Sequence, residues 1–174
     1  AGAWLLRRGL FLPHELPDLL GADIAREGLS RLRPLQHIEA ALKPALRTPY
    51  ARVSTLESSF YLRNQLLRDT DWASMAHSLE VRTPLVDATL LRQLARPLLG
   101  SGRVNNKALL ASSPLVPLPD AVALRAKSGF TTPVAAWQQR GDATQAWRQK
   151  PSLAGAECPW ARRWAYAVMS PKAS

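Results

Sequence analysis

The stretch LLRDTDWASMAHSLEVRTPLVD, residues Leu66–Asp87, decides the fold class of this chain. Small residues dominate between Ala73 and Ser78, which is typical of a helix that lets another backbone approach closely. The residue before Pro84 is pushed towards extended geometry, so the helix should end a few residues earlier. Charged residues also occur in this largely apolar stretch, and their positions bear on function.

Asp71 lies four residues from Leu67 and from Met75, so we place it in an apolar row on one face of the helix. Burying a bare carboxylate costs several kcal/mol unless it is paired. The pattern therefore predicts that Asp71 has donors, either an arginine or backbone N–H groups. A packing clamp between helices and a residue that lines a site are both consistent with this.

Glu80 and Arg82 follow at the end of the helix. Alternate residues of an extended segment point the same way, so the two charges should share one side of a short connector. They then form a local ion pair or clamp a polar ligand, and both interpretations remain open.

Proline punctuation divides the rest of the chain into helical segments, and no segment alternates polar and apolar residues as a strand does. Ser54 and Glu57 have the spacing of a capping box at the start of the longest helix. Thr83 is the expected N-cap of the next helix, with Pro84 at its first position and Asp87 in its first turn. The prediction is a mainly α protein, an irregular helical bundle forming a single domain over residues 1–174.

The composition sets limits on function. The 174 residues are 47% hydrophobic, enough for a core, and carry a formal net charge of +10. The basic residues are scattered rather than gathered in a block, so nucleic acid is not the expected partner. A basic helical binding module for RNA or an acidic protein is the alternative.

One cysteine, Cys158, excludes a disulfide within the chain and indicates a reducing compartment. No apolar run is long enough to span a membrane. The three histidines are far apart in the sequence, so no metal site is expected.

A second polar segment, LRAKSGFTTP, contains Lys127 followed by Ser128 and Gly129. The glycine lets the backbone approach a ligand, and a lysine flanked by Arg125 is suited to a phosphate. A solvated surface loop is the other interpretation of this segment.

Together these residues resemble the C-terminal synthetase domain of the glutamine-hydrolysing asparagine synthetases, most strongly over residues 60–140. That family has an Asp-x-x-Ser-Met-Ala, Leu-Glu-x-Arg-x-Pro and Asp pattern, then a helix-opening Lys, Leu-Pro, and Arg-x-Lys-x-Gly-Phe with Pro and Trp following. The matching residues are Asp71, Ser74, Met75, Ala76, Leu79, Glu80, Arg82, Pro84, Asp87, Lys107, Leu118, Pro119, Arg125, Lys127, Gly129, Phe130, Pro133 and Trp137.

The resemblance implies that this chain is the helical C-terminal part of an α/β adenine-nucleotide hydrolase-like synthetase domain. Such enzymes are cytoplasmic ligases that use ATP and Mg²⁺ to activate the aspartate side chain as an acyl-adenylate, which glutamine-derived ammonia then amidates. By this resemblance Lys127 is catalytic and contacts phosphate. The residues implied to line the site are Asp71, Ser74, Glu80, Arg82, Arg125 and Gly129. A homodimer is also a possible state.

The chain departs from the family in several respects. It contains no Ser-Gly-Gly-x-Asp-Ser loop for pyrophosphate, and neither its first residues nor Cys158 matches the nucleophilic cysteine of the glutaminase half. We therefore expect a part of a longer enzyme that is inactive alone. Gln65 stands where many relatives are acidic, and Asp69 and Trp72 where they are often basic. These differences leave open an amide- or lactam-forming ligase acting on another carboxylate.

Overall fold

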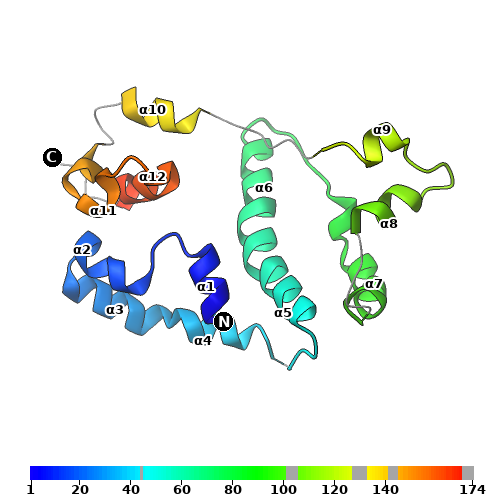
Figure 1. Ribbon diagram of the computed structural model, residues 1–174, viewed down its shortest axis with the longest axis horizontal. Coiled ribbons are helices and arrows are strands. Elements are labelled where there is room, and N and C mark those ends of the chain that lie inside the picture. Colours follow the sequence, from blue (N-terminus) through cyan, green and yellow to red (C-terminus); the bar gives the residue numbers. More distant parts are fainter. Residues whose placement is uncertain (44, 101–105, 127–132, 141–144, 170–174) are drawn as a thin grey trace. The chain divides into compact units, whose positions relative to one another are not determined.

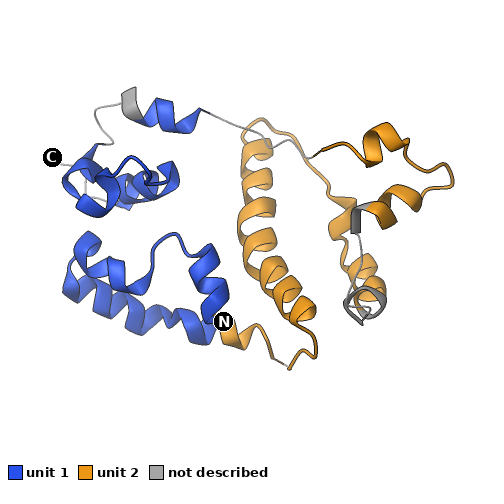
Figure 2. Ribbon diagram, viewed as in Figure 1, with its two compact units in different colours: residues 1–37, 129–174 blue, residues 38–128 orange. Residues whose placement is uncertain are grey.

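The computed structural model describes residues 1–43, 45–100, 106–126, 133–140 and 145–169. Throughout these ranges the regular elements are helices, with no strand, which confirms the predicted mainly α class (Figure 1). The chain divides into two compact units. Unit 1 comprises residues 1–37 and 129–174, and unit 2 comprises residues 38–128 (Figure 2).

Unit 1 combines the two ends of the chain. Its elements are α1 (Gly2–Arg8), the 3₁₀ turn η1 (Pro13–Glu15), α2 (Leu16–Leu20), α3 (Ala22–Leu32), the first part of α4 (Pro34–Ala40), α10 (Val134–Arg140), the 3₁₀ turn η5 (Ala146–Gln149), α11 (Pro151–Ala154) and α12 (Trp160–Met169). Its core centres on Leu19, Trp147 and Leu153, so residues far apart in sequence share one apolar cluster.

Polar contacts also join the two ends of the chain within unit 1. Arg162 pairs with Glu15, and both side chains are about four-fifths buried. The Lys150 ammonium donates to the Asp18 carbonyl at 2.8 Å. Residues 145–169 therefore hold the segment around α2 in place.

Unit 2 contains one long helix and several short ones. Its elements are α5 (Pro49–Leu56), the π-helical segment η2 (Glu57–Leu67), α6 (Arg68–Met75), the 3₁₀ turn η3 (Pro84–Val86), α7 (Ala88–Gly100), α8 (Asn106–Ser112) and α9 (Asp120–Ala123). The first three follow one another without a break in the ribbon (Figure 1).

The long helix begins earlier than the sequence pattern suggests. Thr48, not Ser54, is its N-cap, because the Thr48 Oγ1 accepts a hydrogen bond from the Ala51 backbone N–H at 3.1 Å. Pro49 takes the first helical position, where its missing N–H costs nothing. The predicted capping box at Ser54 and Glu57 is therefore wrong, and both residues lie inside the helix.

The helix after Pro84 also starts differently. Residues Pro84–Val86 form a 3₁₀ turn, and Thr83 makes no side-chain capping bond. The Asp87 carboxylate accepts a hydrogen bond from the Leu90 N–H at 2.8 Å, so Asp87 caps α7. The predicted negative charge at a helix N-terminus is present, but the capping residue is Asp87 rather than Thr83.

Candidate functional site

The site predicted from the sequence begins where α6 ends. The Leu79 N–H donates to the Ser74 carbonyl and the Ser78 N–H to the Met75 carbonyl, each at 3.0 Å. This pair of bonds is a Schellman motif, and Ser78 takes the left-handed conformation that it requires, with φ 57°. The motif stops the helix abruptly and sends Glu80 and Arg82 into the connector to η3.

Glu80 and Arg82 form the local ion pair that was one of the two interpretations of the sequence. The Glu80 Oε1 lies 2.9 Å from the Arg82 Nη2 and 3.1 Å from the Arg82 Nε. The two side chains are 72% and 83% exposed, so the pair holds no buried position and does not clamp one helix to another. Solvent screening leaves little stabilisation in such a pair. The exposed Arg82 guanidinium is thus oriented by Glu80 and accessible to an anion.

Asp71 differs from its prediction. It is exposed on α6, and its neighbour Met75 is 56% exposed, so the expected apolar row is not buried. Within the described residues no donor pairs with the Asp71 carboxylate. Water solvates an exposed carboxylate, so it needs no protein partner. The Asp71 carbonyl accepts a hydrogen bond from the Ser74 hydroxyl at 3.1 Å, which links two of the predicted site residues through the backbone.

Arg125 follows α9 and is exposed. Its backbone N–H donates to the Val122 carbonyl at 3.4 Å, and its side chain is accessible to solvent. Lys127 and Gly129 lie outside the described residues, so the convergence of the Lys127 loop with Glu80 and Arg82 stays a prediction.

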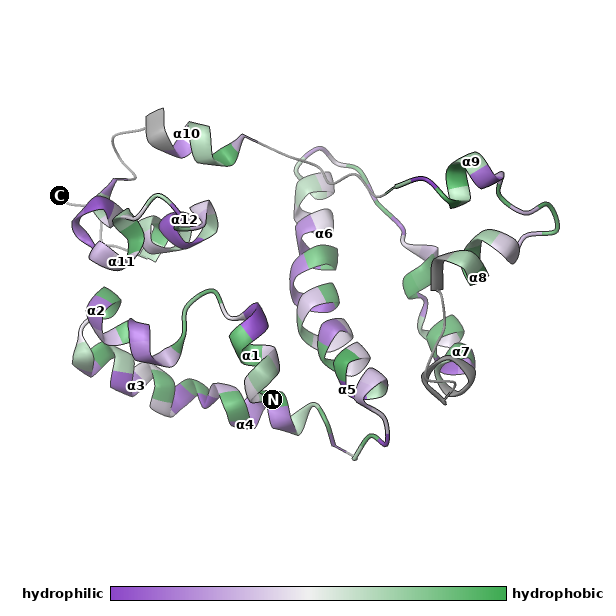
Figure 3. Cartoon of the chain, in the orientation of Figure 1, coloured by the Kyte–Doolittle hydropathy of each residue, from purple (hydrophilic) through white to green (hydrophobic). Residues whose placement is uncertain are grey.

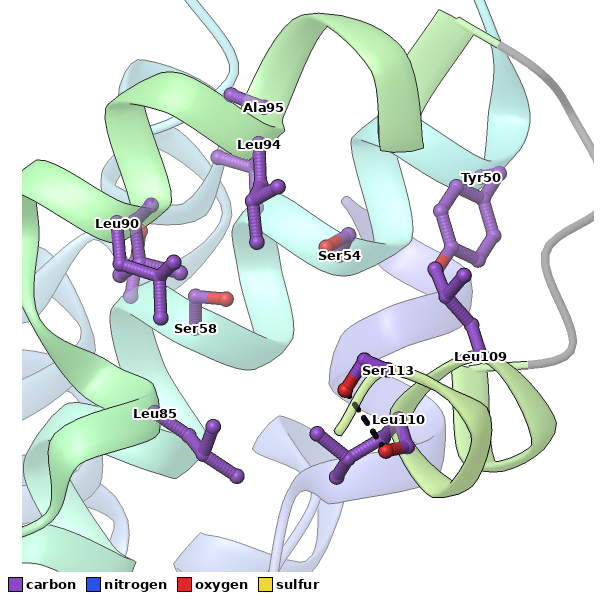
Figure 4. A pocket seen from close by; sticks show the side chains of 13 residues that line it. Tyr50, Ser54, Ser58, Leu85, Leu90, Leu94, Ala95, Leu109, Leu110 and Ser113 are labelled. Atoms are coloured by element: carbon purple, nitrogen blue, oxygen red, sulfur yellow. Dashed lines mark hydrogen bonds between the residues drawn. The ribbon is translucent and has the colours of Figure 1, made fainter. Parts of the chain in front are cut away.

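A pocket in unit 2 was not predicted from the sequence. It has a volume of about 760 Å³ and lies between the long helix, η3, α7 and α8 (Figure 4). Leucines, hydroxyl residues and one alanine line it: Tyr50, Ser54, Thr55, Ser58, Ser59, Leu85, Leu90, Leu91, Leu94, Ala95, Leu109, Leu110 and Ser113. The serine repeat at positions 54, 58 and 59 was the available signal, but its meaning depends on α7 and α8 packing nearby.

Comparison with known families decides the identity of the chain. The family profile described as asparagine synthase matches residues 4–165. The chain belongs to the asparagine synthase family. The match includes Asp71, Ser74, Glu80, Arg82 and Arg125, and it extends on both sides of the range over which the sequence motifs are strongest. No curated protein and no solved structure matches the chain.

Membership of the asparagine synthase family supports a synthetase domain of the ligase type.

The described residues contain no group of three or more His, Cys, Asp or Glu side chains placed to hold a metal ion. No helix in the described part of the chain is both long and apolar enough to cross a bilayer. Among the described residues, the exposed charged groups of the candidate site are the Glu80–Arg82 pair, Asp71 and Arg125.

Proposed function

We propose that this chain provides the helical part of an ATP-dependent asparagine synthetase, a carbon–nitrogen ligase that amidates the side-chain carboxylate of aspartate. The observation that carries the proposal is the family match over residues 4–165, which spans the whole motif series from Asp71 to Trp137. The exposed, ion-paired Arg82 in the connector after α6 is the structural feature that agrees with it.

The proposed reaction has two steps. A carboxylate oxygen of aspartate attacks the α-phosphorus of ATP, and pyrophosphate leaves with the electrons of the broken P–O bond. Ammonia then attacks the acyl carbon of the adenylate, AMP leaves, and the nitrogen loses a proton to give the amide. Both steps shift negative charge onto phosphate oxygens, which preorganised cations stabilise.

The cations of this chain have separate roles in the proposal. Lys127 contacts the phosphates as they separate, and Arg125 lies two residues before it. Glu80 fixes the direction of the Arg82 guanidinium through the two contacts described above, which leaves its remaining N–H groups for a carboxylate or phosphate. By the family resemblance, Asp71, Ser74 and Gly129 are the further residues proposed to line the site.

The described residues contain no group of three or more His, Cys, Asp or Glu side chains that would hold Mg²⁺ by itself. Mg²⁺ commonly binds through substrate phosphates and few protein ligands, so in this proposal it arrives with ATP. The sequence also has no Ser-Gly-Gly-x-Asp-Ser loop and no match to the glutaminase cysteine. We therefore place the pyrophosphate loop and the source of ammonia in an α/β part and a glutaminase domain joined to this chain.

A ligase of the same type acting on another carboxylate is the second candidate. Trp72 stands where relatives often carry a basic residue, and it is 60% exposed. The Arg68 guanidinium lies 4.2 Å from the centroid of its ring, which keeps the indole ordered at the surface. An exposed indole on α6 would favour an acid with a larger apolar body than aspartate.

The direct test uses the enzyme formed by this chain and the α/β part that carries the pyrophosphate loop. Release of AMP and pyrophosphate is measured with aspartate, ATP, Mg²⁺ and ammonia, for wild type and for Lys127→Ala. We expect the substitution to lower the rate roughly 100-fold or more, since it removes a charge from the developing phosphate centre. Lys43→Ala, at an exposed lysine outside the motifs, is the matched control and should retain the wild-type rate.

A near wild-type rate for Lys127→Ala would remove the catalytic role from that residue. If wild type forms AMP with larger carboxylic acids but not with aspartate, the second candidate replaces the first. The 174-residue chain without the α/β part should form neither AMP nor amide.

A further inference from the structure

The pocket of unit 2 lies in a part of the chain to which the proposed ligase reaction gives no task. Its walls come from α5 and η2 on one side and from η3, α7 and α8 on the others (Figure 4). The volume of about 760 Å³ falls in the range of small-molecule sites, roughly 300–1,000 Å³. Leu91, Leu109 and Leu110 remain about half exposed around it, so the packing of the helices leaves apolar surface for an occupant.

The charge of the lining limits the chemistry of that occupant. None of the 13 lining residues is charged, although the chain has a net charge of +10. A carboxylate or phosphate placed here would lose its hydration without gaining a partner, which is costly. The lining therefore favours a neutral occupant.

The serine hydroxyls of the pocket lining favour a ligand that carries a polar group. Figure 4 shows Ser54 and Ser58 on the wall formed by the long helix, with Leu109 and Leu110 on the wall formed by α8. Within the described residues, the hydroxyls of Ser54 and Ser58 have no hydrogen-bond partner, so they are available to a ligand. A hydroxyl can both donate and accept, which suits an alcohol, ketone or amide on an otherwise apolar molecule.

We propose that this pocket binds a neutral, largely apolar small molecule that carries a hydroxyl or carbonyl group. The apolar body contacts Leu85, Leu90 and Leu94, and its polar group meets Ser54 or Ser58. The proposal goes beyond the ligase reaction and does not depend on it, because binding is measured without ATP or turnover.

The test uses two fluorescent probes with the same ring system. N-phenyl-1-naphthylamine is neutral, and 8-anilinonaphthalene-1-sulfonate adds a sulfonate. Titration of the 174-residue chain should show saturable, one-to-one binding of the neutral probe, unchanged by salt. Because no cation lines the pocket, binding of the sulfonate probe there should be at least tenfold weaker, and any binding to the basic surface should fall with salt.

Two neighbouring serines provide matched variants. Ser112 and Ser113 are both exposed, and their hydroxyls donate to the Leu109 and Leu110 carbonyls at 3.2 and 2.9 Å respectively. Only Ser113 lines the pocket. Ser113→Arg should weaken binding of the neutral probe at least tenfold, whereas Ser112→Arg should leave it unchanged. Ser58→Arg, on the opposite wall and exposed, repeats the test, and circular dichroism checks the helix content of each variant.

Equal binding by wild type, Ser113→Arg and Ser58→Arg would overturn the proposal, since the probe would then bind another apolar surface. Absence of saturable binding by wild type would overturn it as well. Addition of hexanamide or 1-octanol should displace the neutral probe in competition, and failure of both to do so would contradict the proposed ligand class.

Discussion

Ser78 forms the turn that ends α6 and leads into the connector that carries Glu80 and Arg82. A non-glycine residue in the left-handed region carries a conformational cost that glycine avoids. Ser78→Gly should therefore stabilise the chain by about 0.5–1 kcal/mol in urea unfolding, because the Schellman bonds are kept and the strain is relieved. Ser112→Gly, near the end of α8, should instead lower the free energy of unfolding in the same measurement. A destabilised Ser78→Gly chain would contradict the αL assignment at this turn.

Glu15 gives a prediction about pH. The hydrogen bond from Arg162, followed by the one from the Leu12 N–H at 2.7 Å, holds the pKa of the Glu15 carboxyl below its ordinary value. The charged form is favoured in the folded state, so its stabilisation is present above the unfolded pKa and is lost as pH falls through the lowered folded pKa. Glu15→Gln should cost about 1.5–3 kcal/mol of unfolding free energy at pH 7, the usual range for a hydrogen bond to a charged group.

The difference in unfolding free energy between wild type and Glu15→Gln should shrink between about pH 5 and pH 2, measured by denaturant titration at each pH. Glu27→Gln removes an exposed carboxylate that pairs with Arg31 on α3, and serves as the control with little effect. A Glu15→Gln penalty that stays constant down to pH 2 would contradict the pairing with Arg162.

At the scale of single residues, the sequence predicted Glu80 and Arg82 better than Asp71. The alternation of an extended strand is a local rule, and it places the two charges together whatever surrounds them. Burial of Asp71 depended instead on another element covering α6, which no local pattern can specify. The Glu15–Arg162 pair joins residues 147 positions apart and left no local signal in the sequence.

Among the helices, α7 is the one whose capping residue differs between the structure and the sequence prediction. The sequence favoured Thr83 as its cap, whereas the structure shows the Asp87 carboxylate accepting the Leu90 N–H. Asp87→Ala should cost about 1 kcal/mol of unfolding free energy, and Thr83→Ala should cost little. Thermal unfolding of the two variants measures this, and a larger loss for Thr83→Ala would favour the sequence pattern over the structure.

The positions of the other helices show which features of the fold local sequence patterns can predict. The helices α8, α9 and α10 lie in segments between prolines, which the sequence predicted to be helical, and Pro119 immediately precedes α9. The long helix was also predicted, but its middle segment, Glu57–Leu67, is π-helical. The i→i+5 hydrogen bonds of a π-helix change the number of residues per turn. Residues that would share a face at α-helical spacing therefore do not share one across this segment. The serines of the pocket lie on both sides of that change.

At the scale of the whole molecule, large apolar side chains are exposed in the described residues of both units. Apolar residues are spread along the helices of both units (Figure 3), and many are exposed, Trp72, Leu79 and Val122 among them. This surface agrees with the proposal that the chain packs against an α/β part that carries the pyrophosphate loop.

The measurement that tests the central proposal most directly follows oxygen from substrate to product. Aspartate labelled with ¹⁸O in its side-chain carboxylate is supplied to the enzyme formed by this chain and the α/β part, with ATP, Mg²⁺ and ammonia. Because the carboxylate oxygen becomes the bridge to the α-phosphorus, mass spectrometry should find one ¹⁸O in the AMP. Label in inorganic phosphate with ADP as the nucleotide product, or unlabelled AMP, would contradict activation of the carboxylate as an acyl-adenylate.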